Sequence, residues 1–245
     1  MNSLSVPHPL VRRLESQLHL SDNDRRAVLG LPMQVVDLRT DQDIVREGDR
    51  PSRSCLILDG FTCTYKVTQE GRRQIVSFNI PGDIPDLQSL HLKVLDNSIG
   101  TIEPCRVGFI LHEDLQSLCE EHPQITACLW RSTLVDAAIF REWVLNVGRR
   151  DAYSGMAHVL CELITRLKVV GLADDHSCNL PITQAEFGDA LGLSGVHVNR
   201  VLQDLRSNDL IRTKGTRLTV PDWDRLTEAG DFDPTYLHLE PRAAV

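Results

Sequence analysis

The sequence predicts an α+β protein with a strand-rich first half, one long central helix and a small C-terminal domain that carries a helix-turn-helix. Three observations support this. Short apolar runs between turn signals fill residues 35–109, residues 124–147 contain neither Gly nor Pro, and residues 183–206 hold two short helical patterns joined by a glycine. The chain has 245 residues, of which 42% are hydrophobic, so it can bury a substantial core.

The strand-rich region is predicted from alternation between turn signals. Residues 55–58 form an apolar run, Asp59-Gly60 is a tight-turn dipeptide, and apolar and polar residues then alternate over residues 61–67. We expect these two segments to form one β-hairpin with a single buried face. Further strands are expected at residues 74–78 and 106–111.

The segment after Pro123 predicts a helix of about 24 residues, about 36 Å long. Its apolar residues fall on two stripes, so the helix is either sandwiched between its own β domain and a second subunit or buried within one domain. Periodicity alone leaves both arrangements open. One stripe contains Cys128, Val135, Ile139, Trp143 and Val147, and the other contains Trp130, Leu134, Ala137 and Leu145. A second helix is expected from Ala152 to Val170, followed by a loop over residues 171–181.

A helix-turn-helix is predicted near the C-terminus. Thr183 and Glu186 form a capping-box pattern, so a helix begins at Gln184, and Gly192 ends it because glycine accepts a left-handed backbone. Ser194 caps the next helix. The apolar positions of that helix keep helical spacing at Val198, Val201, Leu202 and Leu205. Two short helices joined by a glycine-containing turn form this motif.

The second helix of this motif suits the major groove of DNA, where each base pair shows a distinct set of donors and acceptors. Arg200 lies two turns into that helix, where a guanidinium reaches guanine. Asn199 suits adenine, and His197 is a further polar candidate. Gly195 and Val196 at the leading end offer close approach or apolar contact with a thymine methyl group.

Residues 210–220 predict a β-hairpin that turns at Gly215 beside the helix-turn-helix. Residues 176–220 hold five basic and four acidic side chains, whereas the whole chain has a net charge of −8. We therefore expect the contacts with DNA phosphates to lie in this region. The candidate phosphate-binding residues are Thr183, Ser194, Arg206, Arg212, Lys214, Thr216 and Arg217.

These motifs resemble the Crp/Fnr family, the cyclic-AMP-receptor-type bacterial transcription regulators. The resemblance covers nearly the whole chain and is most specific at residues 191–194 and 198–202. It also includes Arg46-Glu47-Gly48-Asp49, Leu56-Ile57-Leu58-Asp59-Gly60 and Pro81-Gly82-Asp83. It implies a homodimeric regulator that binds double-stranded DNA at a near-palindromic operator and contacts RNA polymerase.

The resemblance divides the chain into four parts. It implies a β-roll sensor domain with an N-terminal helical segment at residues 1–122, a dimerisation helix at 123–148 and a winged helix-turn-helix domain at 149–221. An acidic extension follows at residues 222–245, with six acidic and two basic residues. Its aromatic residues are expected to pack on the winged domain, and the sequence assigns it no function.

In cyclic-nucleotide-binding members, a Gly-Glu pair holds the ribose and an Arg-Ser pair holds the cyclic phosphate. Aligned through Pro81-Gly82-Asp83, this chain has Pro85-Asp86 and Asn97-Ser98 instead, so the arginine is missing. A bidentate arginine makes the strongest contact with the cyclic phosphate. Because this chain lacks that arginine, we expect weak or no cyclic AMP binding. The resemblance places the effector pocket at Gly82, Asp83, Asp86, Asn97 and Ser98.

No cofactor is expected, because no ligand motif occurs. Haem remains an alternative through His8, His91 or His112, although a lone histidine is usually not an iron ligand. The seven cysteines show no Cys-x-x-Cys pair or zinc spacing, and none precedes Cys55, so we expect neither a metal site nor an N-terminal iron–sulfur cluster. Redox sensing stays open through the thiols with potential exposure, which are Cys63, Cys119, Cys161 and Cys178.

The sequence predicts a binding protein and no catalytic residues. It contains no Gly-x-Ser-x-Gly elbow, no Gly-rich phosphate loop with lysine and no His-Glu-x-x-His. No apolar stretch reaches the roughly 18 residues of a membrane span, so we expect a cytoplasmic protein with no membrane partner. The alternative function is a small-molecule-binding module whose helix-turn-helix contacts protein instead of DNA, which the acidic net charge permits.

Overall fold

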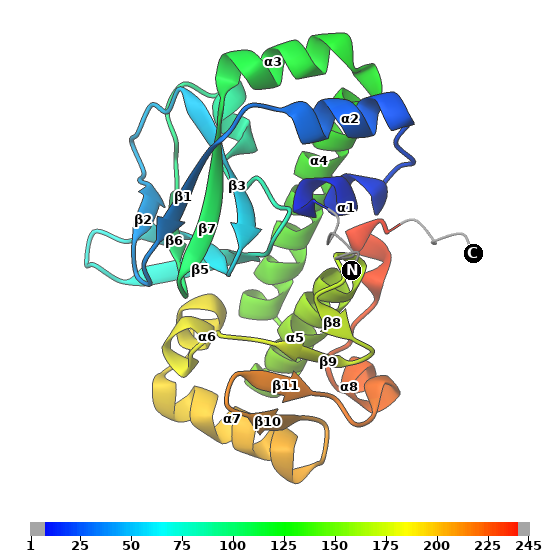
Figure 1. Cartoon of the computed structure of the whole chain (residues 1–245). Helices are drawn as coiled ribbons and strands as arrows, with labels where there is room; N and C mark the ends of the chain where they lie inside the picture. The colour runs from blue at the N-terminus through cyan, green and yellow to red at the C-terminus, as the bar shows by residue number, and fades with distance from the viewer. Residues whose placement is uncertain (1–7, 240–245) are drawn as a thin grey trace. The chain divides into compact units, whose positions relative to one another are not determined.

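The computed structural model describes residues 8–239, which fold into two compact units (Figure 1). The first unit contains residues up to Thr62, residues 79–134 and Leu239, and the second contains residues 63–78 and 135–238. The division therefore runs through the long helix, and a hairpin from the strand-rich half belongs with the C-terminal residues. The sequence-based ranges 1–122 and 222–245 extend into residues 1–7 and 240–245, which lie outside the described residues.

The first unit combines helices with two groups of antiparallel strands. Strands β1, β7 and β3 lie side by side in that order, and β2 pairs with β6 (Figure 1). Its elements are α1 (Pro9–Glu15), α2 (Asp22–Gly30), β1 (Gln34–Leu38), β2 (Asp43–Val45), β3 (Arg53–Asp59), η1 (Leu87–Leu90), β6 (Ser98–Thr101), β7 (Cys105–Leu111) and α3 (His112–Glu121).

Strand β3 is buried on both faces, which explains its continuous apolar run. Leu56 points into a core formed with α1, α2, α3 and the start of the long helix, together with Leu14 and Leu115. Cys55 and Ile57 point into a second core that includes Ile99 and Val107. Successive side chains on a strand face opposite ways, so one strand closes both cores.

The expected hairpin between residues 55–58 and 61–67 is wrong. Strand β3 pairs with β7, whereas β4 (Thr62–Val67) lies in another sheet beside β5 (Arg73–Asn79). The chain changes sheets at Gly60, which has φ +84°, and an added Cβ there would lie 2.7 Å from the sulfur of Cys105. The Asp59-Gly60 turn signal therefore marks a crossing between sheets, at a site that tolerates no side chain.

The second unit is built around helix α5, whose apolar residues Met156, Leu160 and Leu163 are fully buried. Helices α6, α7 and α8 pack on α5. The remaining elements, beside β4 and β5, are α5 (Ala152–Val169), β8 (Ala173–Asp174), β9 (Ser177–Asn179), α6 (Gln184–Leu191), α7 (Gly195–Ser207), β10 (Arg212–Lys214), β11 (Arg217–Thr219), α8 (Trp223–Ala229) and η2 (Pro234–Leu237).

The expected hairpin at residues 210–220 is confirmed as β10 and β11, which turn at Gly215 with φ +60°. The expected loop over residues 171–181 is wrong, because β8 and β9 lie there and extend the sheet to the order β10-β11-β9-β8. Cys178 opposes Leu218, and both side chains are buried. Strands of two and three residues are too short to show alternation in the sequence.

The long helix α4 (Pro123–Gly148) is confirmed and has 26 residues, two more than the length of about 24 expected from the sequence. Most of one predicted stripe is buried, including Cys128, Val135 and Trp143, whereas Val147 at its end is 49% exposed. In the other stripe, Trp130 is 68% and Leu134 is 58% exposed. Burial of the whole helix within one domain is therefore wrong. Among helices in the described part of the chain, none has both the length and the hydropathy needed to cross a bilayer.

Candidate nucleic-acid interface

Local side-chain caps set the ends of the two helices of the motif. The N–H of Glu186 donates to Thr183 Oγ1 at 3.3 Å, and the N–H of Thr183 donates to Glu186 Oε2 at 2.6 Å. Gly192 then takes φ 67° and ends α6, and Ser194 Oγ accepts from the N–H of His197 at 3.3 Å to begin α7. The short turn between these caps fixes α7 against α6.

Helix α7 has one buried and one exposed face. Val198, Val201 and Leu205 are buried against the domain. Their burial directs Arg200 and Asn199 to the surface, as the sequence predicts. The other predicted base-reading residues lie at the start of the helix, where Gly195 and Val196 are exposed and His197 is half-buried, with Val196 84% exposed.

Gln203 lies on the same exposed face, seven residues after Val196 and three after Arg200. Residues three, four and seven apart share one side of a helix, so Gln203 lines up with the predicted readers. Gln203 is not among the base-reading residues predicted from the sequence. Its helical spacing from Arg200 was the available signal, and its amide suits adenine.

The hairpin β10–β11 carries the predicted phosphate-binding residues to the surface. Lys214, Thr216 and Arg217 are exposed at or beside its turn, together with Thr183 and Ser194 at the helix starts, whereas Arg206 is half-buried. Arg212 is engaged by Asp209 through two hydrogen bonds, Nε to Oδ1 and Nη2 to Oδ2, each of 3.0 Å. The hydrogen bonds that Arg212 donates to Asp209 raise the pKa of Arg212. The Asp209 carboxylate therefore occupies the fork that a phosphate would use.

The hairpin β4–β5 contacts the first helix of the motif, a contact that is not among those predicted from the sequence. Arg73 Nε donates to Asp189 Oδ2 at 2.7 Å, and Gln74 Nε2 donates to the carbonyl oxygen of Ala190 at 3.0 Å. Phe78 packs edge-on to Phe187, with ring centroids 6.2 Å apart. The hairpin therefore supports α6 by an ion pair, a hydrogen bond and a ring contact.

In the first unit, helix α1 covers part of the predicted effector segment. Arg13 Nε lies 3.1 Å from Asp83 Oδ1, and both side chains are nearly buried. Gly82 has φ +100°, and a Cβ there would lie 2.8 Å from the carbonyl oxygen of Pro9. Gly82 therefore permits the close approach of α1, and Asp83 already has a cationic partner.

The other three effector residues are buried and polar. Ser98 Oγ accepts from the N–H of Glu47 at 3.0 Å, and Asp86 Oδ1 accepts from the N–H of Cys55 at 2.8 Å. Asp86 Oδ2 and Asn97 Nδ2 are buried with no hydrogen-bond partner among the described residues. Burial raises the pKa of Asp86 to about 7. These two atoms retain capacity to bind a polar group.

The candidate cofactor residues occupy different surroundings. His112 Nε2 lies 3.0 Å from Ser89 Oγ, His91 is exposed, and burial lowers the pKa of His8. Residues 8–239 contain no group of three or more His, Cys, Asp or Glu side chains arranged to hold a metal ion. Of the four thiols named for redox sensing, Cys119 is half-buried, whereas Cys63, Cys161 and Cys178 are buried. Burial raises the pKa of Cys178 to about 11, so its thiolate is scarce at neutral pH.

Comparison with known proteins assigns both halves of the chain to domain families. Residues 35–122 match the cyclic nucleotide-binding domain, and residues 156–229 match the Crp-like helix-turn-helix domain. A similar solved structure is that of FixK2 from Bradyrhizobium japonicum, with a TM-score of 0.73, 24% identity, and coverage of 81% of this chain and 98% of the other.

Similar curated proteins are transcriptional activators. The transcriptional activator protein FnrL of Cereibacter sphaeroides is 26% identical over 195 residues, covering 78% of each chain. A probable transcriptional activator of Rhizobium leguminosarum bv. viciae is 29% identical over 185 residues, covering 75% of this chain and 76% of the other. With the α7 surface described above, these matches define a DNA-binding transcription regulator. The chain belongs to the Crp/Fnr family.

Proposed function

We propose that this regulator binds a near-palindromic operator as a homodimer, with α7 of each subunit in the major groove. The observation that carries the proposal is the exposed row of Val196, Arg200 and Gln203, which the buried side of α7 holds outward. In a two-fold dimer the recognition helices meet successive grooves about 34 Å apart. Binding to promoter fragments, measured by electrophoretic shift, tests this. A shifted complex with two chains per palindromic fragment supports the proposal. Equal binding of the protein to all DNA sequences at every salt concentration contradicts it.

The exposed side of α4 supports a dimer of parallel helices. Trp130, Leu134 and Val144 are 68%, 58% and 73% exposed. With Ala137 and Arg141 they are spaced four, three, four and three residues apart, which is the spacing of a coiled-coil seam. A second copy of this helix would cover these apolar groups.

Sedimentation velocity tests this seam. We expect a dimer for the natural chain and a monomer for the double variant Leu134→Glu and Val144→Glu, because both carboxylates would meet their symmetry mates in an apolar interface. Leu29→Glu is the control, since Leu29 is 54% exposed on α2 and is not one of the seam residues. A natural chain that stays monomeric at tens of micromolar would contradict the proposal.

We propose that the β domain senses a ligand other than cyclic AMP. The position of the phosphate-binding arginine holds Asn97, and Arg13 is already paired with Asp83 at 3.1 Å. Asp86 Oδ2 and Asn97 Nδ2, which have no hydrogen-bond partner among the described residues, suit a polar effector. The proposal includes neither haem nor another cofactor. Calorimetric titration with cyclic AMP should give no saturable heat, and micromolar affinity would refute this.

The remaining parts of the proposal follow from the DNA-binding role. Relatives named as transcriptional activators suggest that the bound protein contacts RNA polymerase. We propose a cytoplasmic protein, since its DNA partner is there, that regulates by binding and performs no catalysis. A transcription assay with purified polymerase separates activation from repression, and absence of any effect on a bound promoter contradicts polymerase contact.

A further inference from the structure

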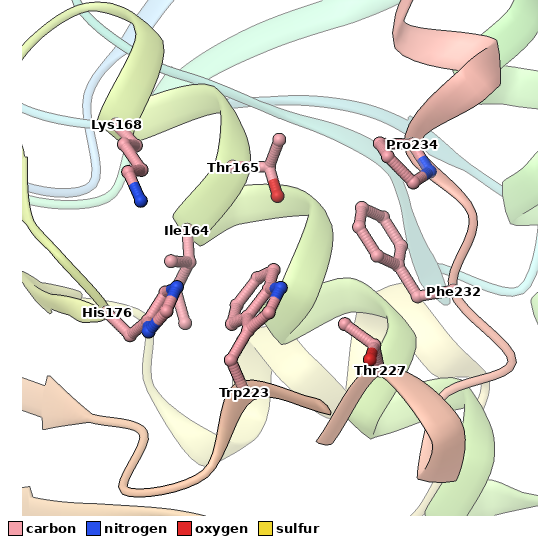
Figure 2. Close-up of a pocket in the computed structure, with 8 residues that line it drawn as sticks. All are labelled: Ile164, Thr165, Lys168, His176, Trp223, Thr227, Phe232 and Pro234. Atoms are coloured by element: carbon pink, nitrogen blue, oxygen red, sulfur yellow. The ribbon is translucent and has the colours of Figure 1, made fainter. Parts of the chain in front are cut away.

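The C-terminal extension, to which the sequence assigns no function, forms one side of a pocket in the second unit. The pocket has a volume of about 400 Å³ and lies between α5, the turn before β9, and the extension (Figure 2). Small-molecule sites in proteins span about 300–1,000 Å³. The lining residues are Ile164, Thr165, Lys168, His176, Trp223, Thr227, Phe232 and Pro234.

Aromatic rings define the shape of this pocket. Trp223 stacks on His176 with ring centroids 4.5 Å apart and an interplanar angle of 6°. Phe232 stands nearly perpendicular to Trp223, with an angle of 81° and centroids 6.4 Å apart. Ile164 adds an aliphatic surface from α5. Flat walls at right angles suit a planar ring, which can stack on one and meet the edge of the other.

The positive charge of the pocket comes from Lys168. Figure 2 shows the Lys168 amine and the Thr165 hydroxyl directed toward the space above Trp223. The nearby carboxylate is that of Asp175, which lies 3.9 Å from Lys168 Nζ and 3.7 Å from His176 Nδ1 and is 86% exposed. These distances exceed a hydrogen bond, so the ammonium group can still bind an anion.

We propose that this pocket binds a small aromatic carboxylate, with its ring against Trp223 and Phe232 and its carboxylate at Lys168. The ring surfaces select an aromatic group, the ammonium selects an anion, and the Thr165 hydroxyl can donate a hydrogen bond to that anion.

A ligand in the pocket can change the position of the β10–β11 hairpin. The carbonyl oxygen of His176 accepts from the N–H of Val220 at 2.9 Å, directly after β11, and the next residue, Ser177, opposes Thr219. A ligand that moves His176 therefore moves the sheet that carries Arg217. This regulatory part rests on the proposed function, whereas binding of the ligand does not.

Calorimetric titration of the full chain with 2-naphthoate tests binding without DNA. We expect one site per chain, with 2-naphthamide and cyclohexanecarboxylate binding much more weakly, because each lacks one of the two recognised features. Lys168→Gln should weaken 2-naphthoate about three- to tenfold, an effect reduced by the half-exposed position of Lys168. Lys93→Gln, at an exposed lysine of the first unit, should change nothing.

Asp175→Asn provides a gain of affinity that a folding defect cannot mimic. Removing the competing carboxylate should strengthen 2-naphthoate binding about two- to fivefold. Asn keeps the side-chain size and tolerates the positive φ of 53° at this position. The site is overturned if 2-naphthoate shows no saturable binding to the natural chain, or if Lys168→Gln and Asp175→Asn leave its affinity unchanged. A bound ligand without effect on operator affinity overturns the regulatory part alone.

Discussion

Arg73 and Asp189 join the β4–β5 hairpin to the first helix of the DNA-binding motif through a contact of 2.7 Å between Nε and Oδ2. The two residues are 116 positions apart in the sequence. The adjacent hydrogen bond from Gln74 and the ring contact between Phe78 and Phe187 give the ion pair a fixed geometry. A displacement of this hairpin would therefore also displace helix α6.

A double-mutant cycle measures this ion pair. Arg73→Ala and Asp189→Ala should show a coupling free energy of about 0.5–1 kcal/mol in urea unfolding, because both side chains are only about one-third exposed. The control cycle uses Arg72 and Glu70, whose side chains are 82% and 74% exposed, and should show no measurable coupling. Equal values for the two cycles would mean that the contact contributes no specific stability.

Replacing Arg200 with Ala should remove a base contact. We expect a loss of about 1–3 kcal/mol on the preferred operator and a smaller loss on unrelated duplexes, so sequence preference relaxes. Fluorescence anisotropy on both duplexes measures the difference. Arg26→Ala, at an exposed arginine of α2, is the matched control. Unchanged discrimination would remove Arg200 from base readout.

Asp209→Asn should strengthen DNA binding, because it releases Arg212 from the two hydrogen bonds of 3.0 Å and removes a negative charge. We expect higher affinity for every duplex and a steeper salt dependence, by up to about one unit in the logarithmic slope. Asn accepts the positive φ of 55° at this position. Asp22→Asn beside Arg25 should leave both quantities unchanged. A loss of affinity in Asp209→Asn would show that the ion pair holds the hairpin in its binding shape.

Tyr236→Phe should lower the free energy of unfolding by about 1–3 kcal/mol. The Tyr236 hydroxyl donates to Glu162 Oε2 at 2.9 Å, and the Glu162 side chain is fully buried. Tyr153→Phe is the control, since the Tyr153 hydroxyl accepts only an exposed hydrogen bond of 3.2 Å from Asn208. Equal losses in the two variants would contradict a special role for the buried pair.

The same variant should change the pH dependence of stability. Burial raises the pKa of Glu162 above the ordinary value of 4.5, so the contribution of Glu162 to stability is fully present below pH 4.5 and is lost as the pH rises through the folded pKa. The hydrogen bond from Tyr236 opposes this shift. Urea unfolding between pH 5 and pH 8 should therefore show a steeper decline for Tyr236→Phe, and parallel curves would contradict it.

The ends of α6 and α7 could be predicted because their signals are local. Thr183 caps an N–H three residues away, Ser194 does the same, and Gly192 adopts its left-handed turn without a distant partner. Helical spacing then placed Arg200 opposite the buried Val198. These interactions close within one or two turns, so adjacent residues contain the needed information.

Strand partners and long-range ion pairs could not be predicted in this way. The sequence gives no sign that Cys55 lies opposite Phe109, because a turn dipeptide after β3 favours pairing with the next strand. Likewise, no signal in the sequence indicates that Arg73 pairs with Asp189. Lys168, His176 and Trp223 converge only in three dimensions, so the sequence assigned the extension no role.

The contact between α8 and α5 limits how the protein can be divided into fragments. At Gly230 a Cβ would lie 2.7 Å from the backbone nitrogen of His158, so the end of α8 meets α5 main chain to main chain. A fragment that stops after β11 would lose this cover and open fully buried His158 and Glu162 to water. Since the hairpin of residues 63–78 also belongs to the second unit, no single cleavage of the chain releases that unit whole.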